Sequence, residues 1–120
     1  MAGASESYHE PFDLISKEAR DLHRALVSCQ EELEAVDWYR QRSDACEDPE
    51  LSEVLLHNMA EEVEHFAMTL EWLRRNSSVF DEQLRTYLFS EGSILAAEGE
   101  AMGRNGDKAG SESSIGDMKE

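Results

Sequence analysis

Apolar residues recur at alternating spacings of four and three over the first third of the chain, the pattern of a helix that packs along its length. The positions are Ile15, Ala19, Leu22, Leu26, Cys29, Leu33 and Val36. This pattern predicts a long helix over residues 12–43. The segment DACEDPE then interrupts it, because Asp48 is a good N-cap and Pro49 suits a first helical position. We expect a second long helix over residues 49–75.

A third, shorter helix is predicted downstream. Ser78, followed by Asp81 three residues later, resembles a weak capping box, and Gly92 is expected to end the helix. Its apolar face would carry Phe80, Leu84, Tyr87 and Leu88. The segment ILAAEGEAM allows one or two further helical turns before glycine and serine become frequent.

The predicted fold is all-α. Two long helices joined by about four residues form an antiparallel hairpin, with the short third helix after it. Two helices bury one stripe each and leave other apolar faces exposed, so we expect two copies to dimerise into a four-helix bundle. The chain then divides into a flexible N-terminus (1–10), a helical domain (11–97) and a flexible tail (98–120).

The chain of 120 residues is strongly acidic, with 27 acidic and 11 basic side chains and a formal net charge of −16. Residues 98–120 hold six acidic and three basic side chains, so −13 lies on the part expected to fold. A surface this negative disfavours nucleic acid and anionic membranes as partners. Cations are the simplest partners that would neutralise it.

The compartment is predicted from what the chain lacks. No apolar run approaches the ~20 residues of a membrane span, and MAGASESYHE has neither the basic nor the apolar region of a signal peptide. We expect a cytoplasmic protein. Cys29 and Cys46 form no Cys-x-x-Cys pair and suit a reducing compartment as one core thiol and one loop thiol.

The second helix carries two neighbouring stripes of different character. One is wholly apolar and predicts a core face: Leu56, Met59, Val63, Phe66, Leu70 and Leu73. The other is apolar at its ends and polar in its middle: Leu51, Leu55, Asn58, Glu62, His65, Thr69 and Trp72. Glu62 and His65 lie one helical turn apart and point the same way, which suits two ligands of one metal ion.

Counting along the hairpin brings a third ligand to this pair. With Glu47 as the midpoint of the turn, Glu62 lies 15 residues after it and Glu32 lies 15 residues before it. A di-iron bundle takes one Glu from each of two helices and Glu-x-x-His from each of the other two, so one chain supplies half of the set. Carboxylates with one imidazole suit iron or manganese better than structural zinc. The expected chemistry is oxidation of Fe(II) to Fe(III).

Ordinary explanations stay open for the other polar and aromatic residues. Carboxylates on a Glu-rich helix are usually solvated, although some of these would suit an outer cation site: Glu31, Glu34, Glu61 and Glu64. No carboxylate is arranged in the same way beside His9, His23 or His57. The aromatics Trp38, Tyr39 and Trp72 suit a core or an interface, and Tyr39, two turns from Glu32, could contact the metal ligands.

Three segments carry a family resemblance: EELEAVDWY (31–39), HN..EE.EH..MTLEWLRR (57–75) and LRTYLF (84–89). Over residues 8–106 the chain resembles the encapsulated ferritins, small ferritin-like cargo proteins of bacterial encapsulin nanocompartments. The resemblance implies ferroxidase ligands at Glu32, Glu62 and His65, contributed by both chains of a dimer. It also implies that further metal-binding positions on the iron route lie at Glu31 and Glu34, with Trp38 beside them. Tyr39 matches a residue close to the di-iron centre.

The resemblance also implies an assembly and a location. Family members form a ring, typically a decamer of five dimers, which oxidises iron while the encapsulin shell in the cytoplasm stores the mineral. Their C-terminal peptide docks on the shell, commonly as Leu-x-Ile-Gly-x-Leu. Here Ile115, Gly116 and Met118 fit its second half, whereas Ser113 replaces the first Leu.

Two other functions stay open. The same ligands would suit a rubrerythrin-like protein that consumes peroxide, although no rubredoxin-like cysteine cluster accompanies them. A non-catalytic helical adaptor would bind a divalent cation without turnover. Calcium or zinc at secondary or substituted positions also stays open.

Overall fold

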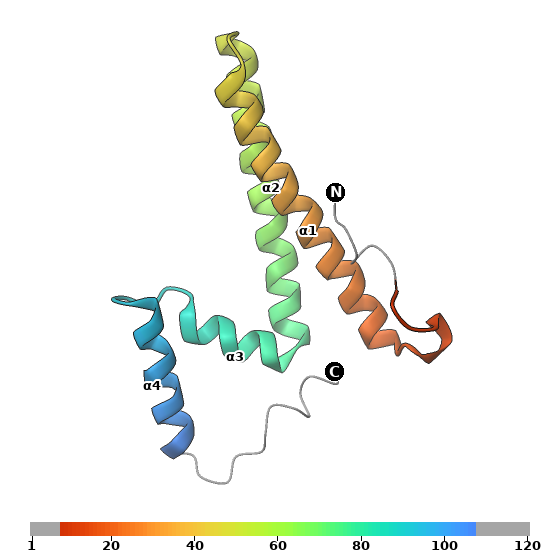
Figure 1. Ribbon diagram of the computed structural model, residues 1–120, viewed down its shortest axis with the longest axis vertical. Helices are drawn as coiled ribbons and strands as arrows, with labels where there is room; N and C mark the ends of the chain where they lie inside the picture. The colour runs from red at the N-terminus through yellow and green to blue at the C-terminus, as the bar shows by residue number, and fades with distance from the viewer. Residues whose placement is uncertain (1–7, 108–120) are drawn as a thin grey trace. The chain divides into compact units, whose positions relative to one another are not determined.

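The computed structural model describes residues 8–107. It consists of the 3-10 turn η2 (Phe12–Leu14) and the helices α1 (Lys17–Ala45), α2 (Pro49–Asn76), α3 (Ser78–Tyr87) and α4 (Ile94–Asp107) (Figure 1). Because these residues contain helices and no strand, the all-α prediction is confirmed. The described residues divide into two compact units, one ending at Trp72 and one beginning at Leu73, so the predicted single domain over 11–97 spans both.

Helix α1 begins later than predicted. Ser16 has an extended backbone, and its hydroxyl accepts a hydrogen bond from the Ala19 amide at 3.1 Å. This cap starts α1 at Lys17, and residues 12–14 form a separate 3-10 turn. Arg20 holds that turn against α1, since its guanidinium lies 3.6 Å from the Phe12 ring centroid and donates to the Phe12 carbonyl at 2.6 Å.

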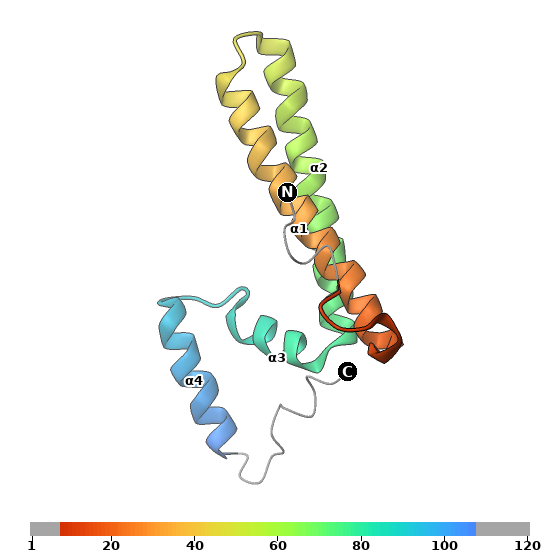
Figure 2. The ribbon, with the colours of Figure 1, turned by 45° about the vertical axis from the view of Figure 1, so that its right-hand side comes forward.

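The connection between α1 and α2 matches the prediction closely. Three residues separate the helices, and the Asp48 carboxylate accepts hydrogen bonds from the amides of Glu50 at 3.0 Å and Leu51 at 3.5 Å. Pro49 is the first residue of α2, where its missing N–H costs nothing. The two helices lie antiparallel and side by side (Figures 1 and 2).

A pair of serines beside this connection sets the register of the hairpin. The Ser43 and Ser52 hydroxyl oxygens lie 2.7 Å apart, and the Ser52 hydroxyl donates to the Ser43 carbonyl at 3.1 Å. Ser43 is 5% exposed and Ser52 is half-buried, so these bonds are partly shielded from water. Glu32 lies eleven residues before Ser43 on α1, and Val63 lies eleven residues after Ser52 on α2. The register therefore places Glu32 level with Val63, one residue from its predicted partner Glu62.

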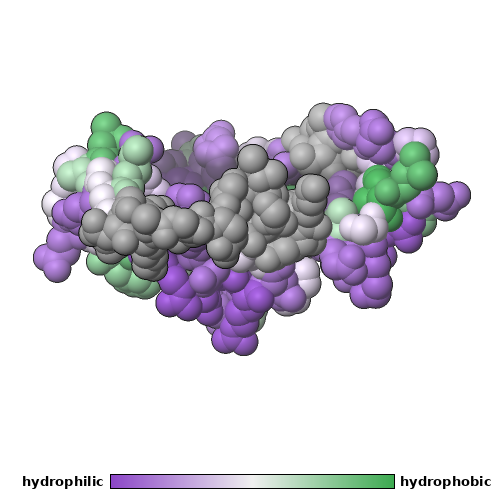
Figure 3. Space-filling model, turned by 90° about the horizontal axis from the view of Figure 1, so that it is seen from below, coloured by the Kyte–Doolittle hydropathy of each residue, from purple (hydrophilic) through white to green (hydrophobic). Residues whose placement is uncertain are grey.

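Few apolar side chains are fully buried. Among the described residues the buried apolar side chains are Cys29, Leu73 and Ala97. The stripes expected to form a core are partly open, with exposed fractions of 40% for Leu26, 51% for Leu33, 37% for Leu56 and 47% for Val63. Hydrophobic patches are likewise visible at the surface in Figure 3. None of the described helices has the length and apolar character of a membrane span.

Helices α3 and α4 differ from the sequence-based bounds. The cap of α3 is Ser77 rather than Ser78, because the Ser77 hydroxyl accepts from the Phe80 amide at 3.3 Å. Helix α3 ends at Tyr87, five residues before Gly92. Phe89, which is fully exposed, has a φ of 62°, a left-handed conformation that is strained for a bulky residue.

Helix α4 is 14 residues long, more than the one or two turns predicted, and its last ten residues belong to the segment expected to be flexible. The proposed boundary at residue 97 therefore falls inside a helix. The predicted docking residues Ile115, Gly116 and Met118 lie outside the described residues, as do residues 1–7 of the N-terminus.

An ion-pair cluster joins the end of α2 to α3. The Asp81 carboxylate accepts from the Arg85 Nε at 2.8 Å and also from the Arg74 guanidinium. Partial burial raises the pKa of Asp81, but the hydrogen bonds from the two guanidinium groups outweigh it, so the pKa lies below its ordinary value.

We expect Asp81→Asn to lower the melting temperature by a few degrees at pH 7, because both guanidinium groups lose their carboxylate partner. The folded pKa is depressed, so this stabilisation is present above the ordinary value of 3.8 and is lost as the pH falls through the folded value. Thermal unfolding followed by circular dichroism should show the difference shrinking toward about pH 2. Glu82→Gln on the same helix is the control; an equal effect there would contradict the prediction.

Candidate metal centre

The polar stripe of α2 brings a carboxylate and an imidazole together. Glu62 Oε1 lies 3.5 Å from His65 Nδ1, with side-chain exposures of 27% and 46%. The separation of three residues produces this proximity because it places both side chains on one face, one turn apart. Both side chains are therefore reachable from solvent and close enough to share one ion.

Glu32 on α1 faces this pair from across the hairpin. Burial is the main influence on its carboxyl and raises its pKa, while a hydrogen bond with the Thr69 side chain and the charge of His65 lower it. The negative charges of Glu62 and Glu31 raise it further, and the net pKa lies above the ordinary value. These interactions join Glu32, Glu62 and His65 into one electrostatic group, the residues that the sequence predicts as ligands.

One oxygen of Glu32 fits a cation. Glu32 Oε1 is buried and accepts no hydrogen bond from the described residues. A buried carboxylate oxygen without a donor costs free energy, and a positive ion would offset that cost. Burial, followed by the Glu32 charge, also raises the pKa of the Cys29 thiol one turn earlier on α1, so this thiol stays protonated.

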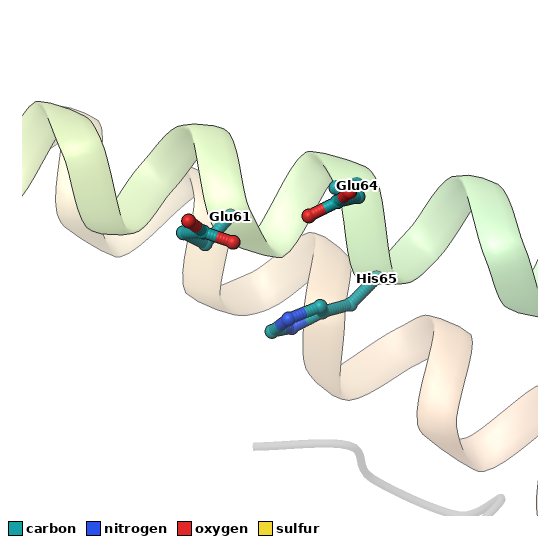
Figure 4. Close-up of side chains that lie close together, drawn as sticks. All are labelled: Glu61, Glu64 and His65. Carbon is teal, nitrogen blue, oxygen red and sulfur yellow. The ribbon is translucent and has the colours of Figure 1, made fainter.

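A second group of potential ligands lies on the outer side of α2. Glu61, Glu64 and His65 each offer an atom, and these atoms all lie within 4.8 Å of one another. The three side chains project from the same helix (Figure 4). His57 Nε2 also lies 3.3 Å from Glu61 Oε1. Exposed carboxylates at helical spacing are common without a metal, so proximity alone does not give this group a function.

The sequence predicts Glu61 and Glu64 as solvated surface or an outer cation site and assigns no role to His57. The signal for this group is the spacing from Glu61, which Glu64 follows by three residues and His65 by four. His65 belongs to both groups, since Glu62 lies near it on one side and Glu61 and Glu64 approach it on the other.

Glu31 and Glu34 lie on a different face of α1 from Glu32. Consecutive helical residues are rotated by about 100°, so spacings of three and four place Glu31 and Glu34 on one face with Trp38. Trp38 is 44% exposed and lines an open pocket of about 290 Å³ with Gln41 and Arg42. Within one chain, Glu31 and Glu34 thus form a separate acidic surface.

Tyr39 contacts a cation on its own helix. The Arg42 guanidinium lies 5.6 Å from the Tyr39 ring centroid and 6.0 Å from that of Trp38. The expectation that Tyr39 contacts the metal ligands stays a prediction.

Comparison with known proteins identifies the family. A family model described as EncFtn-like matches residues 7–91. The chain belongs to the EncFtn-like family. The "Encapsulated ferritin-like protein" of Rhodospirillum rubrum is 54% identical over 120 residues, which cover 98% of this chain and 86% of the relative. The "Ferritin-like protein" of Thermotoga maritima is 46% identical over 114 residues, which cover 95% of each.

A solved structure agrees with this assignment. The crystal structure of protein ne0167 from Nitrosomonas europaea matches with a TM-score of 0.71 and 53% identity, covering 73% of this chain and 97% of that chain. The resemblance to encapsulated ferritins is therefore confirmed, and the helical fold is that of a ferritin-like family. Family membership supports an iron-related, ferritin-like function.

Proposed function

We propose that this protein is a ferroxidase that oxidises Fe(II) to Fe(III) at a di-iron centre shared by two copies of the chain. The observation that carries the proposal is Glu32: its Oε1 is buried and accepts no hydrogen bond from the described residues, and its carboxyl interacts electrostatically with Glu62 and His65. Iron or manganese suits three such donors better than zinc, which favours Cys and His.

The ligand count explains why two copies are needed. One hairpin supplies two carboxylates and one imidazole, and a di-iron bundle takes twice that number. The exposed apolar residues Leu26, Leu33, Leu56 and Val63 give a second copy a surface to cover. A two-fold axis would then bring two half-sites together across the interface.

The residues have distinct roles in this proposal. Ferrous ions supply one electron each to the oxidant, and dioxygen is the acceptor that we propose. Glu32 would hold an ion, while Glu62 and His65 would complete the half-site from α2. Glu31 and Glu34, with Trp38 beside them, form a secondary site on the iron route, which would also suit calcium because calcium takes oxygen ligands. Tyr39 lies near the centre in the assembled protein.

The partners follow from the family. The name of the Rhodospirillum rubrum relative supports a location inside an encapsulin compartment, which we propose lies in the cytoplasm. We propose that dimers assemble into a ring, a decamer of five dimers, and that Ile115, Gly116 and Met118 dock on the shell. The ring oxidises iron, and the shell stores the mineral.

Oxygen consumption tests the site. Protein loaded anaerobically with Fe(II) should consume oxygen when it is admitted, and Glu62→Ala or His65→Ala should lower the rate at least tenfold because each removes a ligand. Glu53→Ala, an exposed acidic position on the same helix, is the control. Unchanged rates in both site variants would contradict the assignment. Oxidation by peroxide but not by oxygen would favour the rubrerythrin-like alternative.

Assembly tests the half-site. Sedimentation velocity should show Fe(II) shifting the chain from monomer toward dimer or ring, since two half-sites share the ions. Glu32→Ala should weaken this shift, whereas Glu53→Ala should keep it. Equal assembly with and without metal would contradict this prediction and show that the metal site does not hold the interface together.

Shell docking tests the tail. Deleting residues 111–120 should abolish co-purification with the encapsulin shell while oxygen consumption stays at the wild-type rate. A truncated chain that still accompanies the shell would show that docking uses other residues.

A further inference from the structure

An open pocket of about 280 Å³ lies between the two long helices, near the half-site. It is lined by Asp21, Arg24, Ala25 and Ser28 of α1 and by Trp72 of α2. Ser28 precedes Glu32 by four residues, and Trp72 follows His65 by seven, so helical spacing places the pocket on the face of the hairpin that carries the half-site. On this face the proposed function requires a second copy of the chain.

The stripe of α2 that carries Glu62 and His65 is symmetric in character about its centre. Leu55 precedes Glu62 by seven residues, and Trp72 follows His65 by seven, so both ends are apolar and the middle is polar. A two-fold axis that crosses α2 between Glu62 and His65, perpendicular to the helix, brings Leu55 of one copy level with Trp72 of the other. Leu55 is half-buried in its own chain and Trp72 is 39% exposed, so both have surface left to bury.

The pocket suits a neutral, aliphatic side chain. Its walls combine the indole of α2 with the small side chains of Ala25 and Ser28, and apolar contact with an indole removes much surface from water. The charges at its rim are paired with one another, since the Asp21 carboxylate lies 3.2 Å from the Lys17 ammonium and 2.6 Å from the Arg24 guanidinium. An apolar occupant would therefore leave no lone charge buried at the rim.

The same axis brings opposite ends of the two hairpins together. It crosses α1 between Glu31 and Glu32, because the register places Glu32 level with Val63. Asp44 follows Glu32 by twelve residues, and Ala19 precedes Glu31 by twelve. The connection between the helices of one copy therefore lies beside the first turns of α1 of the other.

The charges of these two ends favour that arrangement. Residues 44–50 hold four acidic and no basic side chains: Asp44, Glu47, Asp48 and Glu50. Residues 17–24 hold three basic and two acidic side chains: Lys17, Arg20 and Arg24, with Glu18 and Asp21. Antiparallel copies place a net charge of −4 beside one of +1, whereas parallel copies place −4 beside −4.

We propose that a second copy of this chain docks antiparallel on the half-site face and inserts its Leu55 into the pocket beside Trp72. The inference deepens the proposed function and rests on it, because it assumes the interface that a shared di-iron centre requires. The two-fold axis makes this contact twice, once on each side of the centre. The pair of contacts fixes the register in which the two half-sites meet.

Cross-linking of the full-length chain in anaerobic Fe(II) tests the orientation. Cys29 and Cys46 are replaced by alanine, and Lys17→Cys and Leu51→Cys are placed on two separately tagged chains. Within one chain Leu51 lies level with Asp44, 27 residues or about 40 Å from Lys17 along α1. With a bis-maleimide much shorter than that, the mixed dimer of Lys17→Cys and Leu51→Cys chains should be the main product.

Sedimentation equilibrium in anaerobic Fe(II) tests the pocket. Leu55→Ala should raise the Kd of the dimer about tenfold, because it removes the side chain that fills the pocket. Val54→Ala is the matched control, since Val54 is 49% exposed and lies on the outer side of α2 with His57 and Glu61. Its Kd should stay within about twofold of wild type.

Products that link each chain to its own kind, or no mixed product at all, would overturn the inference. An unchanged Kd in Leu55→Ala, or an equal rise in Val54→Ala, would overturn it as well. If Leu55→Ala loses its helical circular dichroism, the cross-linking result alone decides, because those chains keep Leu55. Mixed cross-links in a protein that consumes no oxygen with Fe(II) would overturn the proposed function and leave this inference standing.

Discussion

The register of the α1–α2 hairpin is the constraint on which the rest of the structure depends. The partly buried hydrogen bonds between Ser43 and Ser52 fix it, and the Asp48 cap begins α2 beside them. A slip of one residue would turn a helix by about 100° and carry Glu32 away from Glu62. The candidate site therefore depends on two serines that lie several turns from it and contribute no ligand.

Within that register, the environment of Glu32 disfavours its negative charge. Burial and the neighbouring carboxylates act in one direction, while Thr69 and His65 compensate in part. The conditions that destabilise a lone carboxylate are those in which a bound cation stabilises most, because it neutralises several like charges at once. The chain's net charge of −16 also attracts cations to its surface and favours their approach.

The sequence predicted the features that local chemistry determines. The predicted start of α2 was correct because Asp48 and Pro49 act on the amides beside them. The predicted start of α1 was wrong because the apolar spacing continues to Ile15, which precedes the Ser16 cap where the helix begins. Spacing alone brought Glu32 opposite Glu62 and His65. The proximity of Glu61, Glu64 and His65 depends on the orientation of exposed side chains, which helical periodicity does not specify.

The scarcity of buried apolar residues in one chain has a thermodynamic consequence. Cys29, Leu73 and Ala97 are the fully buried apolar residues of the described chain, so an isolated protomer leaves much of its apolar surface in contact with water. In the dimer that we propose, most of the gain from burying this surface would come from association, so folding and assembly would form one equilibrium governed by mass action. The stability of the chain would then rise with protein concentration.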